Sequence, residues 1–197
     1  MRAQREGLRR EARARRRALP AAERRATALA VARHLSASGW LRPGLRVAAY
    51  LALPEEIDVS PCLAMALRRG CETWLPRIES ARRGRMVFAP TGAALRINAF
   101  GIPEPATPER LSSRWISLVL MPLVAYDAHG ARLGMGGGFY DRALDWRRLR
   151  TAWRGPRLVG IAHSTQRIDQ ILSLPHDVRL DAVITEQGLS LFRKDPR

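Results

Sequence analysis

The sequence predicts an α/β fold with a mostly parallel β-sheet that helices cover on both faces. Short apolar segments bounded by Pro or Gly alternate with segments of helical composition along most of the chain, and this alternation is typical of parallel sheets. With 197 residues, of which 46% are hydrophobic, the chain is long enough to bury a sizeable core.

Two helices are predicted at the N-terminus. Residues 2–17 consist mostly of Arg, Ala, Glu and Leu, which are good helix formers. Pro20 ends this helix and suits the first turn of a second helix, which we expect to reach about residue 37.

The first strands follow these helices. Residues 45–51 (LRVAAYL) are apolar and bounded by Pro and Gly, which indicates a buried strand. Ser60 is expected to be the N-cap of the next helix, with Pro61 at its first position, and Gly70 ends it. Residues 71–76 (CETWLP) form the next predicted strand.

The second half continues the alternation. Residues 80–113 are interrupted by Pro and Gly, with an exposed loop tip at 80–85 and a short strand at 86–89. Residues 117–122 (SLVLMP) are the most strand-like segment of the chain. After a polar loop and a run of glycines, the predicted elements are a helix over 139–150 and strands over 157–163 and 180–185.

The chain is strongly basic, with 34 Lys and Arg residues against 18 Asp and Glu, a formal net charge of +16. Such an excess points to an anionic partner. However, Lys194 is the only lysine, and Ala is also very common. Because a general Arg and Ala bias can arise from genome composition, the charge is weak evidence for nucleic-acid binding.

Cysteine content and hydropathy exclude other classes. Cys62 and Cys71 are the only cysteines, so we expect ordinary thiols in a reducing cytoplasm rather than a disulfide framework or a zinc site. The longest apolar run, residues 115–126, is shorter than the roughly 20 residues that a membrane helix needs. We therefore expect no membrane association.

The glycine run in RLGMGGGFYD (132–141) predicts a phosphate site. It lies between the strand at 117–122 and a helix, and ligands of open α/β sheets bind beyond the carboxyl ends of strands. Glycines let backbone amides approach phosphate oxygens closely. Arg132 can add a forked charge-assisted contact, and Asp141 can hold Mg²⁺ against a triphosphate.

Two known phosphate motifs do not fit this run. No Lys-Ser/Thr pair follows the glycines, as a Walker A loop requires, and Phe139 stands where the dinucleotide fingerprint needs its last glycine. A flexible linker is the alternative to a site. Four glycines between an Arg and an aromatic pair followed by Asp favour the site.

At this point the sequence resembles the 5-formyltetrahydrofolate cyclo-ligase family, also called 5,10-methenyltetrahydrofolate synthetases. The similarity covers nearly the whole chain, and its most specific part is LVLMPLVAYDAHGARLGMGGGFYDRAL at 118–144. The other landmarks occur in the family order and are GLRREARARRRAL (7–19), EEID (55–58), WLPRI (74–78), FGIPEP (100–105) and LPHDVRLDAVITE (174–186).

The resemblance implies a ligase of folate one-carbon metabolism that depends on ATP and Mg²⁺. It would convert 5-formyltetrahydrofolate to 5,10-methenyltetrahydrofolate and release ADP and phosphate. In the family's mechanism the formyl oxygen attacks the γ-phosphate, and N10 then closes the ring on the imino-phosphate. The implied fold is a three-layer α/β/α sandwich in a single domain (1–197), preceded by an Arg-rich N-terminal helix. The helices of residues 1–38 would contribute to the ATP site.

The resemblance also assigns residues to ATP and Mg²⁺. Asp141 and Asp181 match the carboxylates for Mg²⁺, and Arg132 and Asp141 have catalytic roles. Without the resemblance, Asp181 is equally well interpreted as an aspartate of a turn. Arg5 and Arg9 would be interpreted as solvated arginines that share one helix face. The positions implied for ATP are Arg5, Arg9, Arg132, Gly134, Met135, Gly136, Gly137, Gly138, Phe139 and Tyr140.

Folate binding is implied for a second set of residues. Glu56 matches an acidic residue near the reacting nitrogen and is the third expected catalytic residue. Aromatic side chains can stack on a pterin ring. The full set is Leu51, Glu56, Phe100, Phe139 and Tyr140, and Pro76, Arg77 and Gln166 fit family positions whose roles are less defined.

The chain departs from the family pattern in two places. Some members carry a basic residue within the glycine loop, where this chain has Met135 and Gly137. The first aromatic of the pair is often Tyr and is Phe139 here, which keeps the stacking face and removes a hydroxyl. We assign no role to His129, His163 or His176.

Two other functions stay open. A nucleic-acid-binding module would need aromatic residues among the N-terminal arginines, and none occurs before Trp40. The ATP site could also serve another carbonyl-bearing acceptor, which the glycine loop alone does not distinguish. We expect a cytoplasmic monomer that binds only small molecules, although the sequence does not determine the oligomeric state.

Overall fold

The computed structural model describes residues 2–149 and 155–192. Its helices are α1 (Arg2–Arg17), α2 (Ala21–Ala37), α3 (Ser60–Arg68) and α4 (Phe139–Leu144), with 3₁₀ turns at Ser113–Trp115, Asp145–Leu149 and Ser164–Gln166. The main sheet contains β1 (Arg46–Ala48), β2 (Glu72–Ser80), β3 (Arg85–Pro90), β6 (Leu118–Pro122), β9 (Arg157–Ile161), β10 (Ala182–Thr185) and β11 (Gly188–Leu191). Two small hairpins pair β4 (Leu95–Ile97) with β5 (Pro103–Pro105) and β7 (Ala125–Tyr126) with β8 (Arg132–Leu133).

The strand order confirms the predicted α/β fold with a mostly parallel sheet. The order is β11-β10-β9-β6-β1-β2-β3, in which β2, β1, β6, β9 and β10 run parallel. The edge strands β3 and β11 are antiparallel to their neighbours. Strand β1 has β2 on one side and β6 on the other. The order in which strands are added to the sheet therefore changes direction between β1 and β6.

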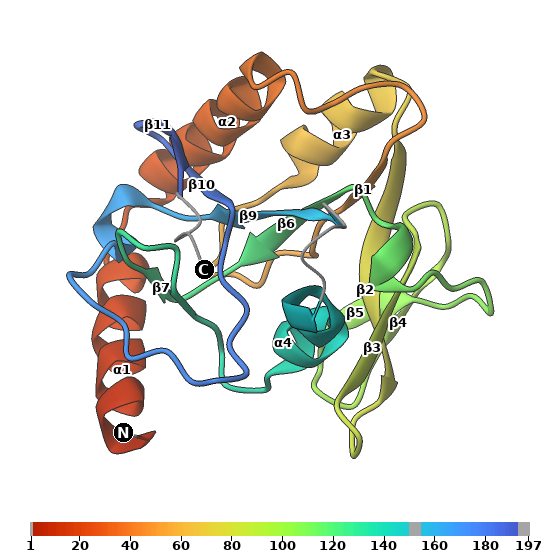
Figure 1. Cartoon of the computed structure of the whole chain (residues 1–197). Coiled ribbons are helices and arrows are strands. Elements are labelled where there is room, and N and C mark those ends of the chain that lie inside the picture. Colours follow the sequence, from red (N-terminus) through yellow and green to blue (C-terminus); the bar gives the residue numbers. More distant parts are fainter. Residues whose placement is uncertain (1, 150–154, 193–197) are drawn as a thin grey trace.

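Alternating residues of the strands face two cores, which accounts for the three layers in Figure 1. Leu118 and Leu120 pack with α2 and α3 on one face of the sheet. Val119 and Met121 pack with Leu144 of α4 on the other face. Because both faces are covered, the parallel strands are apolar throughout, as in LVLMP.

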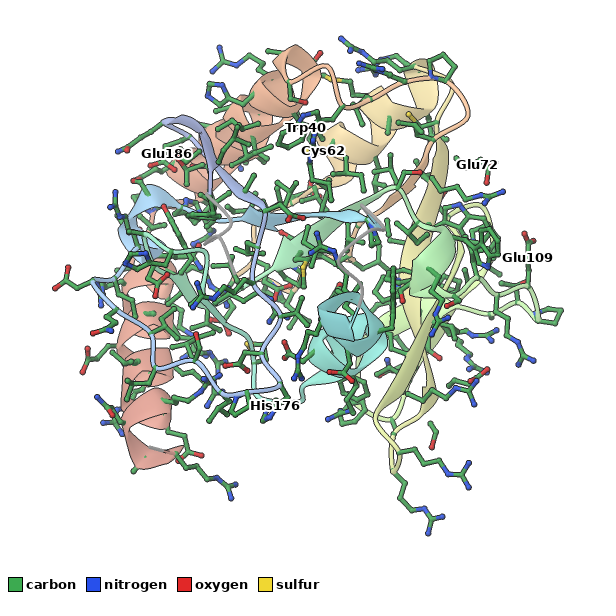
Figure 2. The ribbon with its side chains drawn as sticks, viewed as in Figure 1. Trp40, Cys62, Glu72, Glu109, His176 and Glu186 are labelled. Carbon is green, nitrogen blue, oxygen red and sulfur yellow. The ribbon has the colours of Figure 1, made fainter. Side chains whose placement is uncertain are left out.

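Helix α1 docks beside the second core rather than on the sheet itself (Figure 1). Ala12 is fully buried and packs with Val124, Leu133 and Ile171 in a third apolar cluster. Figure 2 shows His176 on the loop below the sheet, on the side of α4, whereas Cys62 lies on the side of α2 and α3. The segments around residues 124–133 and 171–178 therefore fill the layer between α1 and α4.

Several element bounds differ from the prediction. The strand expected at 45–51 is only β1, because the chain turns away after Ala48 to build a loop. The helix after the glycines is α helical only to Leu144 and continues as a 3₁₀ turn to Leu149, and the predicted end at Arg150 lies outside the described residues. Ser60 is the first residue of α3 and Val59 is its N-cap, and Asp58 accepts hydrogen bonds from the Ser60 amide and hydroxyl. None of the described helices is long and apolar enough to span a membrane.

Candidate active site

A cavity of about 850 Å³ opens at the carboxyl ends of β1 and β6. This is the point where the strand order reverses, which is the usual ligand position in open α/β sheets. The loop after β1 contributes Tyr50, Leu51 and Glu56, and Pro122 ends β6. The remaining wall comes from α1, the hairpins, the glycine loop and the loop at 174–177.

The glycine loop, residues 134–138, forms one wall of this cavity. Gly136 (φ +102°) and Gly138 (φ +63°) adopt left-handed backbone conformations that other residues rarely tolerate. A Cβ on Gly134 would meet only the Arg132 side chain, at 3.8 Å. The chain fold therefore requires glycine at 136 and 138, whereas Gly134 leaves open space that a ligand can occupy.

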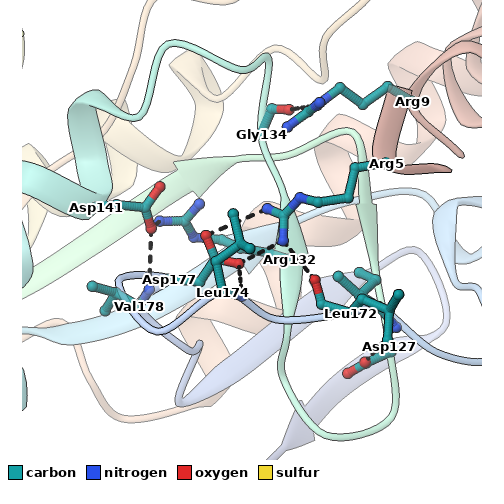
Figure 3. Close-up of polar contacts among 11 residues, drawn as sticks. Arg5, Arg9, Asp127, Arg132, Gly134, Asp141, Leu172, Leu174, Asp177 and Val178 are labelled. Carbon is teal, nitrogen blue, oxygen red and sulfur yellow. Dashed lines mark hydrogen bonds and ion pairs between the residues drawn. The ribbon is translucent and has the colours of Figure 1, made fainter. Parts of the chain in front are cut away.

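Arg132 and Asp141 form a buried ion pair at the base of the loop (Figure 3). Arg132 Nη2 donates to Asp141 Oδ1 at 2.7 Å, and the Val178 amide donates to the same oxygen at 3.1 Å. The Nε of Arg132 is buried and has no hydrogen-bond partner in the described residues. The pair therefore retains an unused donor, the Arg132 Nε, beside the carboxylate of Asp141.

Arginines of α1 reach the same cavity from the other side (Figure 3). Arg9 Nε donates to the Gly134 carbonyl at 2.9 Å. Arg5 Nη1 donates to Asp177 Oδ2 at 2.7 Å and to the Leu172 carbonyl at 2.6 Å. Burial and the neighbouring Arg5 lower the pKa of Arg9. Two crowded cations that line one cavity favour an anionic ligand.

Glu56 carries its carboxylate into the apolar part of the cavity. Burial raises the pKa of Glu56, although the Leu53 amide, which donates to Oε2 at 3.0 Å, and Arg16 oppose the rise. The Tyr140 hydroxyl is buried without a partner in the described residues, and the nearby Glu56 adds to the effect of burial in raising its pKa. Both groups are positioned to bind a polar part of a ligand.

The aromatic residues expected around the pterin lie together. The rings of Phe100 and Phe139 meet edge to face, with centroids 5.5 Å apart. Phe139, Tyr140, Leu51 and Pro76 line the cavity, whereas Phe100 is half exposed and packs behind Phe139 at the rim. The cavity thus has a cationic wall and an aromatic wall.

Asp181 does not join this site, which corrects its expected pairing with Asp141. It lies at the amino end of β10, where Arg147 Nη2 donates to both of its oxygens at 2.7 and 2.9 Å. The Leu158 amide also donates to Asp181 Oδ2, at 2.8 Å. These contacts make Asp181 a link between the 3₁₀ turn after α4 and the sheet, away from the cavity lining.

Other predicted positions divide between the cavity and the scaffold. Met135 and His176 line the cavity. Gln166 instead donates to the Leu123 and Val124 carbonyls at 2.9 Å and holds the chain after β6. Arg77 donates to the Thr107 carbonyl. His129 is exposed and His163 is buried, and neither lines the cavity.

Three functional residues were missed from the sequence. Asp177 lines the cavity beside Asp141, but spacing alone does not distinguish it from Asp181. Glu55 binds Arg13, Arg16 and Arg17 of α1 and so fixes the loop that carries Glu56. Arg142, in the last turn of α4, contacts the glycine loop. Only the tertiary contacts reveal these roles.

Comparisons with known proteins identify the family of the chain. The model of the 5-formyltetrahydrofolate cyclo-ligase family matches residues 1–186. The chain is 34% identical over 144 residues to a 5-formyltetrahydrofolate cyclo-ligase of Escherichia coli K12, covering 71% of this chain and 76% of that protein. A mouse (Mus musculus) 5-formyltetrahydrofolate cyclo-ligase is 26% identical over 190 residues, covering 92% and 93%.

A solved structure extends the similarity to the fold. The NMR structure of Aquifex aeolicus 5,10-methenyltetrahydrofolate synthetase superposes with a TM-score of 0.80. It is 28% identical and covers 98% of this chain and 95% of its own.

Proposed function

The chain belongs to the 5-formyltetrahydrofolate cyclo-ligase family, and on this premise we propose that it converts 5-formyltetrahydrofolate to 5,10-methenyltetrahydrofolate with hydrolysis of ATP. The main observation in support of this proposal is the cavity at the carboxyl ends of β1 and β6, where the strand order reverses. A glycine loop with two arginines lies on one side of it, and a buried carboxylate with aromatic rings lies on the other. One cavity thus offers complementary walls to a triphosphate and to a folate.

The cationic wall is the proposed ATP site. Arg132 has a free buried Nε, and Arg9 uses its Nε on Gly134, which leaves its terminal nitrogens for another acceptor. Arg5, held by Asp177, adds positive charge to the same wall. These donors and the loop amides suit phosphate oxygens.

The carboxylates of Asp141 and Asp177 fit an Mg²⁺ ion at this wall. Both line the cavity, and the Val178 amide bonded to Asp141 follows Asp177 directly in sequence. The described residues contain no group of three His, Cys, Asp or Glu side chains that could hold a metal. Mg²⁺ needs only one or two carboxylates when phosphate oxygens complete its shell. When bound, it would neutralise charge on the transferred phosphoryl group.

The apolar wall is the proposed folate site and brings the reacting groups together. The formyl oxygen attacks the γ-phosphorus and displaces ADP, which turns a poor electrophile into an imino-phosphate. N10 then attacks the formyl carbon, phosphate leaves, and N10 loses its proton. Glu56 is the proposed acceptor of that proton, because a carboxylate with a raised pKa is a better base.

A turnover assay tests the function. Purified protein with ATP and Mg²⁺ should convert 5-formyltetrahydrofolate to the methenyl product, which is followed by its near-ultraviolet absorbance, with one ADP released per product. ADP release without the methenyl product would indicate another carbonyl acceptor. Folded protein that yields neither product would refute the proposal.

We also propose that a single chain forms the complete site and works in the cytoplasm. Both cysteines are free and buried in the structure, which suits a reducing compartment. Sedimentation analysis should show that the active species is a monomer without nucleic acid.

A further inference from the structure

Arg142 joins the glycine loop to a segment 58 residues away in sequence. It lies in α4 and does not line the cavity. Its Nε donates to the Gly84 carbonyl at 3.0 Å, and its Nη2 donates to the Gly137 carbonyl. Gly84 belongs to the turn between β2 and β3. One side chain therefore binds main-chain oxygens of two loops.

Both loops are shaped to admit this guanidinium. A Cβ on Gly84 would overlap the guanidinium of Arg142, and a Cβ on Gly138 would lie 2.9 Å from its Nη1. A side chain at either position would therefore displace Arg142 or the loop.

A third contact extends the connection to the aromatic wall. The Arg142 guanidinium lies over the Phe139 ring, 5.4 Å from its centroid, which is within the range of cation–π attraction. Phe139 in turn meets Phe100 edge to face. Arg142 thus contacts the glycine loop, the β2–β3 turn and the first residue of α4.

The contact with Gly137 determines where the next amide points. In a trans peptide, the carbonyl of Gly137 and the N–H of Gly138 point in opposite directions. Arg142, whose side chain does not line the cavity, holds that carbonyl. The same contact therefore fixes the direction of the N–H of Gly138, which does line the cavity.

We propose that Arg142 is a positioning residue that fixes the glycine loop in its phosphate-binding conformation by tying it to the β2–β3 turn. The role concerns nucleotide affinity and rests on the proposed ATP site. Because the guanidinium makes two main-chain hydrogen bonds, an ammonium or an amide at this position reproduces them only in part.

The experiment compares Arg142→Gln, Arg142→Lys and Gly84→Ala with a control, Arg148→Gln. Arg148 pairs with the exposed Asp145 and lies in the 3₁₀ turn that continues α4. Kinetics give KM for ATP and kcat, and hydrogen exchange measures protection of residues 134–138. Arg142→Gln should raise KM for ATP about tenfold, the effect of one lost charge-assisted hydrogen bond, with kcat changed less than about threefold.

The other variants separate positioning from general destabilisation. Arg142→Lys should give a KM for ATP between those of the native protein and Arg142→Gln. Gly84→Ala alone should raise the KM for ATP, but combining it with Arg142→Gln should raise this KM little further. Exchange at 134–138 should accelerate in Arg142→Gln and Gly84→Ala and stay unchanged in Arg148→Gln.

The proposal would be overturned if Arg142→Gln left the rate of amide hydrogen exchange at residues 134–138 unchanged. It would also be overturned if Arg148→Gln raised the KM for ATP as much as Arg142→Gln does. The exchange measurement needs no ligand. If the native protein binds no ATP, the proposed function therefore fails separately, and exchange still decides whether Arg142 orders the loop.

Discussion

Asp141 accepts two hydrogen bonds through its Oδ1, one from Arg132 and one from the Val178 amide. Replacing it by Asn keeps the shape and removes the charge. We expect Asp141→Asn to lower kcat/KM for ATP about 10–100-fold and to raise the Mg²⁺ concentration needed for half-maximal rate, as for other lost metal contacts.

The control for this prediction is Asp145→Asn, one turn further on, where the carboxylate is exposed and pairs with Arg148. Thermal unfolding of both variants shows whether the fold is intact. Turnover of Asp141→Asn at the native rate would remove Asp141 from the site.

Glu56 supplies a prediction about pH. Burial raises its pKa above the ordinary value of 4.5. If the ionised form accepts the N10 proton, the rate must fall as pH drops through that raised pKa. Glu56→Gln should lower kcat about 10²–10⁴-fold, the usual contribution of a general base, and should abolish the acidic limb of the profile. If the rate of Glu56→Gln still fell with decreasing pH in the same range, another group would be the acceptor of the proton.

At the residue scale, local chemistry predicted that the glycine run, Arg132 and Asp141 lie together. They are close in sequence, and the structure places all of them in the lining of one cavity. Glu56 and the α1 arginines required the family resemblance, because isolated charged residues are usually solvated. The Asp177 and Asp181 carboxylates are four residues apart, and only the start of β10 determines which of them faces the cavity.

At the scale of the elements, Glu55 ties α1 to the loop after β1. Arg13 and Arg17 donate hydrogen bonds to Glu55 and Arg16 forms an ion pair with it. These contacts, that of Arg13 first, lower the pKa of Glu55 to about 2. The side chain of Arg16 is 2% exposed, so removing its partner leaves a buried charge uncompensated. Glu55→Gln should lower the free energy of unfolding at pH 7 by about 2–3 kcal/mol.

The pH dependence of this loss follows from the lowered pKa. Glu55 stabilises the fold fully above its unfolded pKa of about 4.5, and the stabilisation disappears as pH falls toward 2. Urea unfolding of the native and Glu55→Gln proteins should therefore differ at pH 7 and converge in acid. Glu72→Gln is the control, since its partner Arg46 is exposed and such pairs contribute less than about 1 kcal/mol. A constant difference at all pH values would contradict this account.

In the structure, α1 is held by Ala12 in an apolar cluster and by Glu55. Helices and buried strands were predictable from propensity and periodicity. The lengths of β1 and α4 were not, because they depend on where the chain turns to build the cavity.

For the whole molecule, the order of elements determines where ligands bind. The reversal of strand order between β1 and β6 brings together loops that are about 80 residues apart in sequence, one with Glu56 and one with the glycines. Alternation of strands and helices predicted the parallel sheet, whereas the antiparallel edges β3 and β11 and the small hairpins gave no comparable signal. These hairpins supply part of the cavity wall, so the folate side of the site was the less predictable one.

The central claim is that one cavity holds both substrates, with the triphosphate on the glycine loop and the pterin beside Glu56. A crystal structure with a non-hydrolysable ATP analogue and 5-formyltetrahydrofolate tests it directly. We predict phosphate oxygens against the amides of residues 134–138 and Arg132, and the formyl group between the γ-phosphate and Glu56. Nucleotide bound elsewhere, with this loop unoccupied, would contradict the account.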